Sequence, residues 1–173
     1  MDGFRALLHC ESGHVRLISR RNNTYKLFDP LCRSIEAVLT RDVVLDGEIV
    51  CLDAEGRPQF YDLLRKRGTP VFYAFDVLSL DGWDLRLVAC LRRKQALRRL
   101  IPENCGAMLY AQHVIGTGVE FFRLACERDL EGILAKHAQW RYGAGWFKFR
   151  NPHYTQYEGR RELFERKRAA FSA

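Results

Sequence analysis

The sequence predicts an α+β fold built mainly from antiparallel strands with flanking helices. Runs of alternating apolar and polar residues dominate the first half of the chain, and segments with apolar residues at helical spacing lie between them. The strands and helices do not alternate regularly, which argues against a parallel sheet made of repeated strand–helix–strand units. The hydrophobic fraction is 47% with only five prolines, so we expect a folded chain with a sizeable core.

Four strands are expected in the first half, at residues 4–10, 15–19, 43–52 and 69–80. The first two flank Glu11-Ser12-Gly13-His14, which has the composition of a hairpin turn. Asp81-Gly82 closes the fourth strand. Gly47 lies inside the third, where a glycine indicates a bulge or a close approach of another backbone.

Helices are expected at residues 31–39, 60–67, 90–100 and 120–128. The 90–100 helix is basic and amphipathic, with Leu91, Leu97 and Leu100 on one side. Residues 146–150 alternate aromatic and basic side chains, so a strand there would place Lys148 and Arg150 on one face. We expect one domain over residues 1–157, followed by a charged, solvated helical tail at 158–173.

The chain is basic, with a formal net charge of +7 and a pI of about 9.3. This balance suits a polyanionic partner, either nucleic acid or nucleotide, although a basic surface without a partner is the alternative. The basic stretches at 92–99 and 160–168 are the expected phosphate contacts.

Six cysteines occur without a C-x-x-C pair, and four of them lie in apolar runs, which suits reduced, buried thiols. No targeting segment and no apolar run of membrane-spanning length is found. We therefore expect a cytoplasmic protein with no membrane partner.

Six short strings contain the groups that adenylyl transfer from ATP requires: cations for the phosphates, carboxylates for a divalent metal and an aromatic face for the base. They are D-G-F-R at 2–5, S-R at 19–20, D-G-E at 46–48, F-Y-A-F-D at 72–76, E-G-I-L-A-K at 131–136 and W-F-K-F-R-N-P at 146–152. Taken singly, each has an ordinary structural interpretation. D-G-E is usually a turn, Phe75 would be a core residue, Glu131 and Lys136 would lie on the surface, and Lys148 and Arg150 would form an exposed strand face.

Taken together and in this order, the strings resemble the motif series of the ATP-dependent DNA ligases, with the ligase domain of bacterial end-joining ligases as the nearest likeness. The resemblance covers nearly the whole chain, including LDGEIVCLDAEGRPQFYDLL at 45–64 and EGRRELFER at 158–166. It implies the nucleotidyltransferase fold of DNA ligases and capping enzymes. RNA ligation or RNA capping is the alternative within the enzyme class, and these two stretches favour DNA.

The resemblance also implies a reaction. A lysine attacks ATP and carries AMP, AMP passes to the 5′-phosphate at a nick in duplex DNA, and the 3′-hydroxyl then displaces it to seal the strand. This chemistry serves DNA repair and recombination, and it uses ATP together with Mg²⁺ or Mn²⁺.

Roles for individual residues follow from the same resemblance. Arg5 and Arg20 would contact the ribose or a phosphate. Glu48 would hold the ribose hydroxyl and is a second candidate for the metal. Phe75 would stack on adenine.

The last two strings supply the remaining roles that the resemblance implies. Glu131 would hold the metal. Lys148, and with it Lys136, would face the α-phosphate, so that Lys148, Arg5 and Lys136 form the expected catalytic set. Arg150 stands where relatives carry a lysine, and it keeps the charge but presents a planar fork.

The attacking lysine of the motif K-x-D-G-x-R would precede Met1, which occupies the first x. The chain as written is therefore expected not to form an AMP adduct. An OB-fold domain is expected to follow the tail, or to be supplied by a separate end-joining partner. The alternative from another class is a catalytically inactive remnant that binds nucleotide or DNA.

Overall fold

The computed structural model describes residues 3–103 and 105–155 of the 173-residue chain. These residues divide into two compact units. The first unit contains the described part of Met1–His113 together with Lys136–Gly145, and the second contains Val114–Ala135 and the described residues from Trp146 onward. The predicted helical tail at 158–173 lies outside the described residues, as does Asp2 of the D-G-F-R string.

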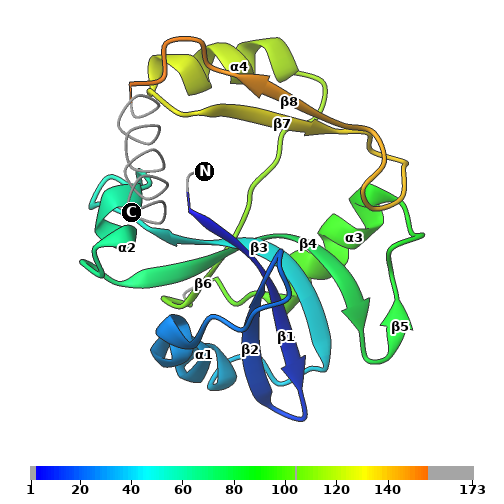
Figure 1. The fold of residues 1–173 in the computed structure, drawn as a ribbon. Helices are drawn as coiled ribbons and strands as arrows, with labels where there is room; N and C mark the ends of the chain where they lie inside the picture. The colour runs from blue at the N-terminus through cyan, green and yellow to red at the C-terminus, as the bar shows by residue number, and fades with distance from the viewer. Residues whose placement is uncertain (1–2, 104, 156–173) are drawn as a thin grey trace, which may run out of the picture. The chain divides into compact units, whose positions relative to one another are not determined.

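A six-stranded sheet forms the centre of the first unit (Figure 1). The strand order is β2-β1-β3-β4-β5, and β6 pairs with β4. The strands are β1 Phe4–Glu11, β2 His14–Ser19, β3 Val43–Cys51, β4 Pro70–Leu80, β5 Trp83–Asp84 and β6 Met108–Tyr110. All pairs are antiparallel except β4 with β6. The mainly antiparallel sheet is confirmed, and each of the four predicted strands is correct to within one residue at either end.

The two predicted turns are also confirmed. Ser12 and Gly13 have φ angles of 50° and 79° between β1 and β2, and Asp81 and Gly82 have φ angles of 47° and 82° between β4 and β5. Two consecutive residues with positive φ are what a two-residue turn needs if it is to match the twist of the flanking strands.

Two irregularities interrupt the pairing of β3 with β4. Leu45 pairs with Val77 and Asp46 with Asp76, but Gly47 pairs with Ala74, so Phe75 is an extra residue on β4. A Cβ atom at Gly47 would lie 2.4 Å from the Phe72 ring and 2.8 Å from the Tyr73 carbonyl oxygen, which is why only glycine fits there. The predicted bulge and close approach are confirmed, whereas the ordinary interpretation of D-G-E as a turn is wrong because this string lies inside β3.

The predicted helices all exist, and three of the four differ from the prediction at their ends. The helices are η1 Lys26–Phe28, α1 Asp29–Glu36, α2 Phe60–Leu64 and α3 Cys90–Leu100 in the first unit, and α4 Gly118–Glu127 in the second. The prediction for α3 is correct at both ends. α2 stops three residues before its predicted end, since Lys66 and Gly68 take φ angles of 60° and 72° that an α-helix does not allow.

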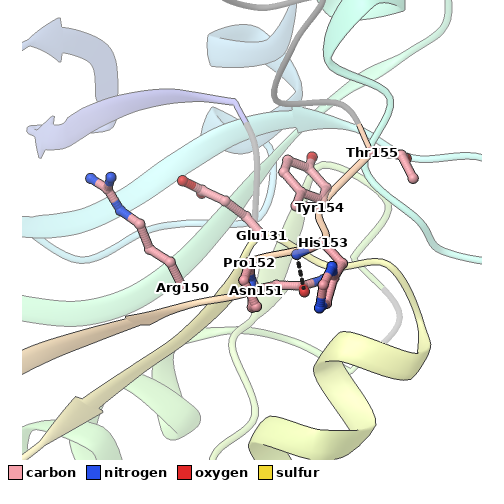
Figure 2. A pocket seen from close by; sticks show the side chains of 7 residues that line it. All are labelled: Glu131, Arg150, Asn151, Pro152, His153, Tyr154 and Thr155. Carbon is pink, nitrogen blue, oxygen red and sulfur yellow. Dashed lines mark hydrogen bonds between the residues drawn. The ribbon is translucent and has the colours of Figure 1, made fainter.

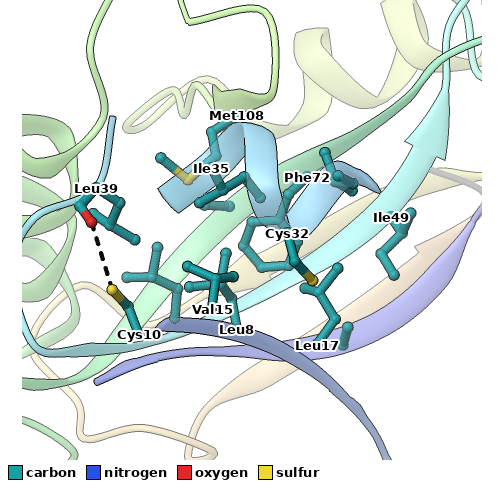
Figure 3. Close-up of a cluster of buried hydrophobic side chains, with 14 of the residues drawn as sticks. Leu8, Cys10, Val15, Leu17, Cys32, Ile35, Leu39, Ile49, Phe72 and Met108 are labelled. Carbon is teal, nitrogen blue, oxygen red and sulfur yellow. Dashed lines mark hydrogen bonds between the residues drawn. The ribbon is translucent and has the colours of Figure 1, made fainter. Parts of the chain in front are cut away.

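The hydrophobic core of the first unit lies between the sheet and its helices (Figure 3). Side chains from β1, β2, β3, β4, α1 and β6 meet there, among them Leu8, Val15, Leu17, Ile35, Ile49, Phe72 and Met108. All six cysteines are free thiols: Cys10, Cys32, Cys51, Cys90 and Cys105 are buried, and Cys126 is half-buried. The predicted reduced, buried thiols are thus found at five of the six positions, and burial raises the pKa of the Cys10, Cys32 and Cys51 thiols.

The second unit contains α4 and most of a two-stranded sheet, β7 Gly132–Lys136 with β8 Trp146–Arg150. Gly132 has φ +138°, and a Cβ atom there would lie 2.0 Å from the Phe149 carbonyl oxygen, so the two strands require glycine at this point. Asn151 is buried and donates its Nδ2 to the Leu130 carbonyl at 3.0 Å, which fastens the end of β8 to the start of β7. No helix within residues 3–103 and 105–155 is long and apolar enough to cross a membrane.

Candidate nucleotide-binding site

One face of the first unit's sheet carries charged side chains, and the other faces the core. Arg5 on β1 lies opposite Glu48 on β3, and Glu48 lies opposite Tyr73 on β4. Residues directly opposite each other project from the same face of a sheet. Their chain neighbours Ala6 and Phe72 are buried in the core. Two predicted site residues, Arg5 and Glu48, therefore share a face.

Asp46 fixes the position of Arg5. The Arg5 guanidinium donates from Nε to Oδ1 at 3.0 Å and from Nη2 to Oδ2 at 2.5 Å. The Tyr142 hydroxyl donates to the same carboxylate at 2.6 Å. The Asp46 side chain has no exposed surface, and the Arg5 side chain is 27% exposed. This two-bonded geometry is the strong form of an arginine–carboxylate pair.

The hydrogen bonds and charges of this cluster keep Arg5 ionised and Tyr142 protonated. Burial acts to lower the pKa of Arg5, but the hydrogen bond and the charge of Asp46 outweigh burial, and the pKa is raised. Burial, and after it the hydrogen bond to Asp46, raises the pKa of Tyr142 to about 12. Tyr142 therefore keeps its proton at neutral pH and remains a donor.

A second carboxylate, Asp76, holds two further cations. Arg93 of α3 donates to it from Nε at 2.8 Å and from Nη2 at 3.1 Å, and neither side chain has exposed surface. Lys136 donates from Nζ to Oδ2 of Asp76 at 3.2 Å. The remaining Nη1 of Arg93 donates to the main-chain carbonyls of Val88 and, at 3.4 Å, Trp140.

The bulge at Phe75 lies next to this cluster. In a regular strand Phe75 and Asp76 would project from opposite faces, but an inserted residue changes the direction of side chains locally. The Phe75 ring lies 5.2 Å from Cζ of Arg5 and 4.9 Å from Nζ of Lys136. Phe75 is half-buried and is not part of the core cluster. Three predicted site residues, Arg5, Phe75 and Lys136, thus meet within the first unit.

Arg20 lies in the exposed turn that follows β2. Its charge acts on Tyr25, opposing the pKa rise that burial causes there. The Tyr25 hydroxyl donates to the Arg5 carbonyl at 3.5 Å. Tyr25 is therefore near Arg20 and contacts the main chain of Arg5.

The predicted phosphate contacts of the 92–99 stretch need a correction. Arg93 is fully buried and Lys94 is 6% exposed, so neither presents its charge to a nucleic acid. Lys94 donates from Nζ to the Ala111 carbonyl at 2.5 Å and lies 4.2 Å from the Tyr110 ring centroid. Burial, and after it the charge of Lys136, lowers the pKa of Lys94 to about 8. Arg92 on the same helix is exposed.

The second unit brings together the other predicted residues. Lys148 of β8 donates from Nζ to Oε1 of Glu131 at 2.6 Å, with side-chain exposures of 46% and 20%. Glu131 and Arg150 also line a pocket of about 540 Å³. Figure 2 shows the pocket, whose other lining residues are Asn151, Pro152, His153, Tyr154 and Thr155.

The two residues predicted to hold a metal lie in different units, Glu48 in the first and Glu131 in the second. Across the described part of the chain, no group of three or more His, Cys, Asp or Glu side chains could hold a metal ion. Mg²⁺ commonly takes only one or two carboxylates and completes its shell with water and substrate phosphates. A single carboxylate such as Glu131 is compatible with that mode of binding.

Sequence reasoning did not assign roles to four residues that organise this site: Asp46, Asp76, Arg93 and Tyr142. The two aspartates carried a signal, because a carboxylate inside an apolar strand requires a partner. Arg93 and Tyr142 carried none, since their partners lie 17 and 96 residues away along the chain.

Comparison with known proteins identifies the class to which this fold belongs. The fold is that of the ligase nucleotidyltransferases, as predicted. A solved structure of mycobacterial DNA ligase D complexed with ATP and MES is 33% identical with a TM-score of 0.75, and the match covers 86% of this chain and 52% of that one. The chain belongs to the ATP dependent DNA ligase domain family, whose model matches residues 1–152.

Curated relatives agree with this family. The multifunctional non-homologous end joining DNA repair protein LigD of Mycobacterium tuberculosis is 35% identical over 147 residues, which are 83% of this chain and 19% of the relative. A probable DNA ligase of Streptomyces coelicolor is 30% identical over 177 residues, 88% of this chain and 34% of the relative. The chain thus spans about a fifth to a third of the length of these relatives.

Proposed function

We propose that this chain is the adenylyl-transfer domain of an ATP-dependent DNA ligase that works in DNA repair by end joining, taking AMP from ATP and passing it to a 5′-phosphate at a break in duplex DNA. The observation that carries the proposal is the meeting of Arg5 and Lys136 around Phe75. These residues come from three strings that lie far apart in the sequence. An aromatic ring flanked by fixed cations suits a nucleotide, because the base can stack on the ring while the phosphates face positive charge.

In the first unit, Phe75 would receive the adenine, and Glu48 would accept a hydrogen bond from a ribose hydroxyl. Arg5 and Arg20 would contact the ribose or a phosphate. Lys136 would face the α-phosphate. Because Asp46 and Asp76 already hold Arg5 and Lys136 in place, little reorganisation would be needed when charge develops on the phosphate.

In the second unit, Lys148 and Arg150 would neutralise phosphate oxygens, and Glu131 would hold Mg²⁺. The ion, when bound, would supply further positive charge to the phosphates of ATP. Glu131 is paired with Lys148, so metal and phosphate would have to replace that pair. The exchange costs little, because an exposed ion pair contributes under about 1 kcal/mol.

DNA is the proposed acceptor for two reasons. The relatives are named as DNA ligases and end-joining proteins, and the chain carries a net charge of +7. Binding that depends on phosphate neutralisation should weaken as salt rises. With Arg93 and Lys94 buried, the cations of α3 that can contribute are the exposed Arg92 and Arg99 together with Arg98, whose side chain is 40% exposed and pairs with Glu103.

The test is formation of an AMP adduct in the presence of ATP and Mg²⁺. In the motif the attacking lysine precedes Met1, so we would compare the chain as written with a version that carries a lysine and a short segment ahead of Met1. A version with arginine in place of that lysine is the matched control, because it keeps the charge but cannot act as a nucleophile.

Intact-mass spectrometry should show a gain of about 329 Da, the mass of an added AMP, on the lysine version alone. An adduct on the chain as written, or on the arginine version, would place the nucleophile elsewhere. ATP binding without any adduct on the lysine version would favour the catalytically inactive nucleotide-binding alternative.

A further inference from the structure

We propose that Arg93 of α3 is a positioning residue for adenylyl transfer, acting through Asp76 on Lys136; the inference rests on the proposed function above. Arg93 holds the carboxylate that holds Lys136, and the Lys136 ammonium group lies 4.9 Å from the Phe75 ring.

The geometry of Arg93 is that of a clamp. Its Nε and Nη2 bind the two oxygens of Asp76, and its Nη1 binds the carbonyls of Val88 and Trp140. The guanidinium is planar and offers its donors in fixed directions. With both Asp76 oxygens bound by Arg93, the carboxylate cannot rotate, and Oδ2 presents one direction to Lys136.

Arg93 also approaches the segment that holds Arg5. Its bond to the Trp140 carbonyl lies two residues from Tyr142, and its Cζ is 5.8 Å from the Tyr142 ring centroid. The Tyr142 hydroxyl donates to Asp46, the partner of Arg5. One buried guanidinium is therefore linked to both cations around Phe75, to Lys136 through Asp76 and to Arg5 through Tyr142 and Asp46.

Stability alone is a weak reason for this arrangement. Taking two charges out of water is costly, and replacing a buried ion pair with apolar side chains is often neutral or stabilising. A fully buried arginine that also satisfies two main-chain carbonyls is better suited to hold a geometry, because a catalytic group acts well only when its support is rigid.

The test is a double-mutant cycle in the lysine-extended protein that forms the AMP adduct. Arg93→Lys keeps the charge but loses the fork, and Arg33→Lys changes an exposed arginine of helix α1 as the matched control. Lys136→Met removes the ammonium group at similar length. Single-turnover rates of adduct formation would be measured for each variant alone and for Arg93→Lys with Lys136→Met, and normalised to folded protein by circular dichroism.

Arg93→Lys should slow adduct formation about 10-fold to 100-fold, as small misplacements of a reacting group do, and Arg33→Lys should leave the rate unchanged. In the Lys136→Met background the effect of Arg93→Lys should disappear, because coupled residues are not additive. The proposal would be overturned if Arg93→Lys slowed adduct formation by the same factor in both backgrounds, or if it left the rate unchanged. Should Lys136→Met be too slow to follow, Lys136→Gln takes its place in the cycle, because it also removes the charge that pairs with Asp76.

Two further outcomes are decisive. If Arg93→Lys does not fold, Asp76→Asn replaces it, since it removes the charge at nearly constant shape and should lose its effect in the same background. Failure of both variants to fold would assign the pair to stability and reject the inference. Absence of an adduct on the unsubstituted lysine-extended protein would instead reject the proposed function, which keeps the two failures distinct.

Discussion

The two units hold their site residues in contrasting ways. In the first unit, the carboxylates of Asp46 and Asp76 have no exposed surface, and each binds two partners from distant parts of the chain. In the second unit, Glu131 and Lys148 form one contact between side chains that are 20% and 46% exposed. The first arrangement is a buried network and the second is a single surface pair.

This difference in burial suits the two units to different roles in ligand binding. A buried network costs desolvation energy but fixes direction, because few other partners are available to its members. An exposed pair fixes little and can exchange one partner for a ligand at low cost. We therefore expect the first unit to provide a preformed nucleotide platform and the second to provide groups that change partners when ATP and metal bind.

Removal of the Asp76 carboxylate should produce the largest difference in stability between the two units. Asp76→Ala leaves the buried Arg93 charge without its partner, and such a loss typically costs about 3–5 kcal/mol of folding free energy. Urea unfolding would measure it. Glu131→Ala is the matched control in the second unit and should cost under about 1 kcal/mol. Equal losses for the two variants would show that burial does not distinguish the clusters.

The buried Lys94 of the first unit should make the free energy of unfolding depend on pH. Its pKa in the folded protein is lowered from 10.5 to about 8, so between these values the unfolded chain binds the extra proton. The free energy of unfolding should therefore rise as pH increases from 8 to 10.5, by about 3 kcal/mol for a shift of this size. Below pH 8 both states are protonated, and the penalty is constant.

Urea unfolding of Lys94→Met at pH 7.5 and pH 10.5 isolates the contribution of Lys94 from that of every other group in the protein. The variant should lack most of the rise. Lys26→Met alters an exposed lysine and should behave as the unsubstituted protein. A rise of the same size in all three proteins would contradict the assignment.

The smallest free-energy effect is expected in the second unit and concerns activity. In the lysine-extended protein, Glu131→Ala and Lys148→Ala should each slow adduct formation roughly 10²-fold, about 2.7 kcal/mol on the barrier, as loss of one charge-stabilising group does. Melting temperature measured on the same samples should change little. If Glu131→Ala melts much earlier and loses activity only in proportion to folded protein, Glu131 is a structural residue.

Sequence reasoning was accurate where local pattern decides the outcome. The strands of the central sheet, the turns at Ser12-Gly13 and Asp81-Gly82, and both ends of α3 follow from alternation, positive φ and helical spacing. The short strands β5 and β6 could not be predicted, because two or three residues contain no pattern. The parallel pairing of β6 depends on the course of the chain after α3, and no local signal encodes it.

The same distinction between local pattern and tertiary fold applies to the candidate site. The strings identified Arg5, Phe75 and Lys136, which the first unit brings together. The basic spacing of α3 suggested a solvated face, yet Arg93 and Lys94 are buried. Charge in a sequence does not reveal burial, since the groups that neutralise it are placed by the tertiary fold. The bulge that adds Phe75 to β4 likewise required the register of the neighbouring strand.

The positions of the thiols allow local unfolding of this protein to be followed through cysteine reactivity. Cys10, Cys32, Cys51 and Cys90 lie one each on β1, α1, β3 and α3, and Cys105 follows α3. A cysteine reagent applied to the native protein would meet the half-buried Cys126 first. The buried thiols would react only as their own segments come apart. Pulses of alkylation followed by peptide mapping would therefore reveal the order in which parts of the first unit loosen, without any introduced label.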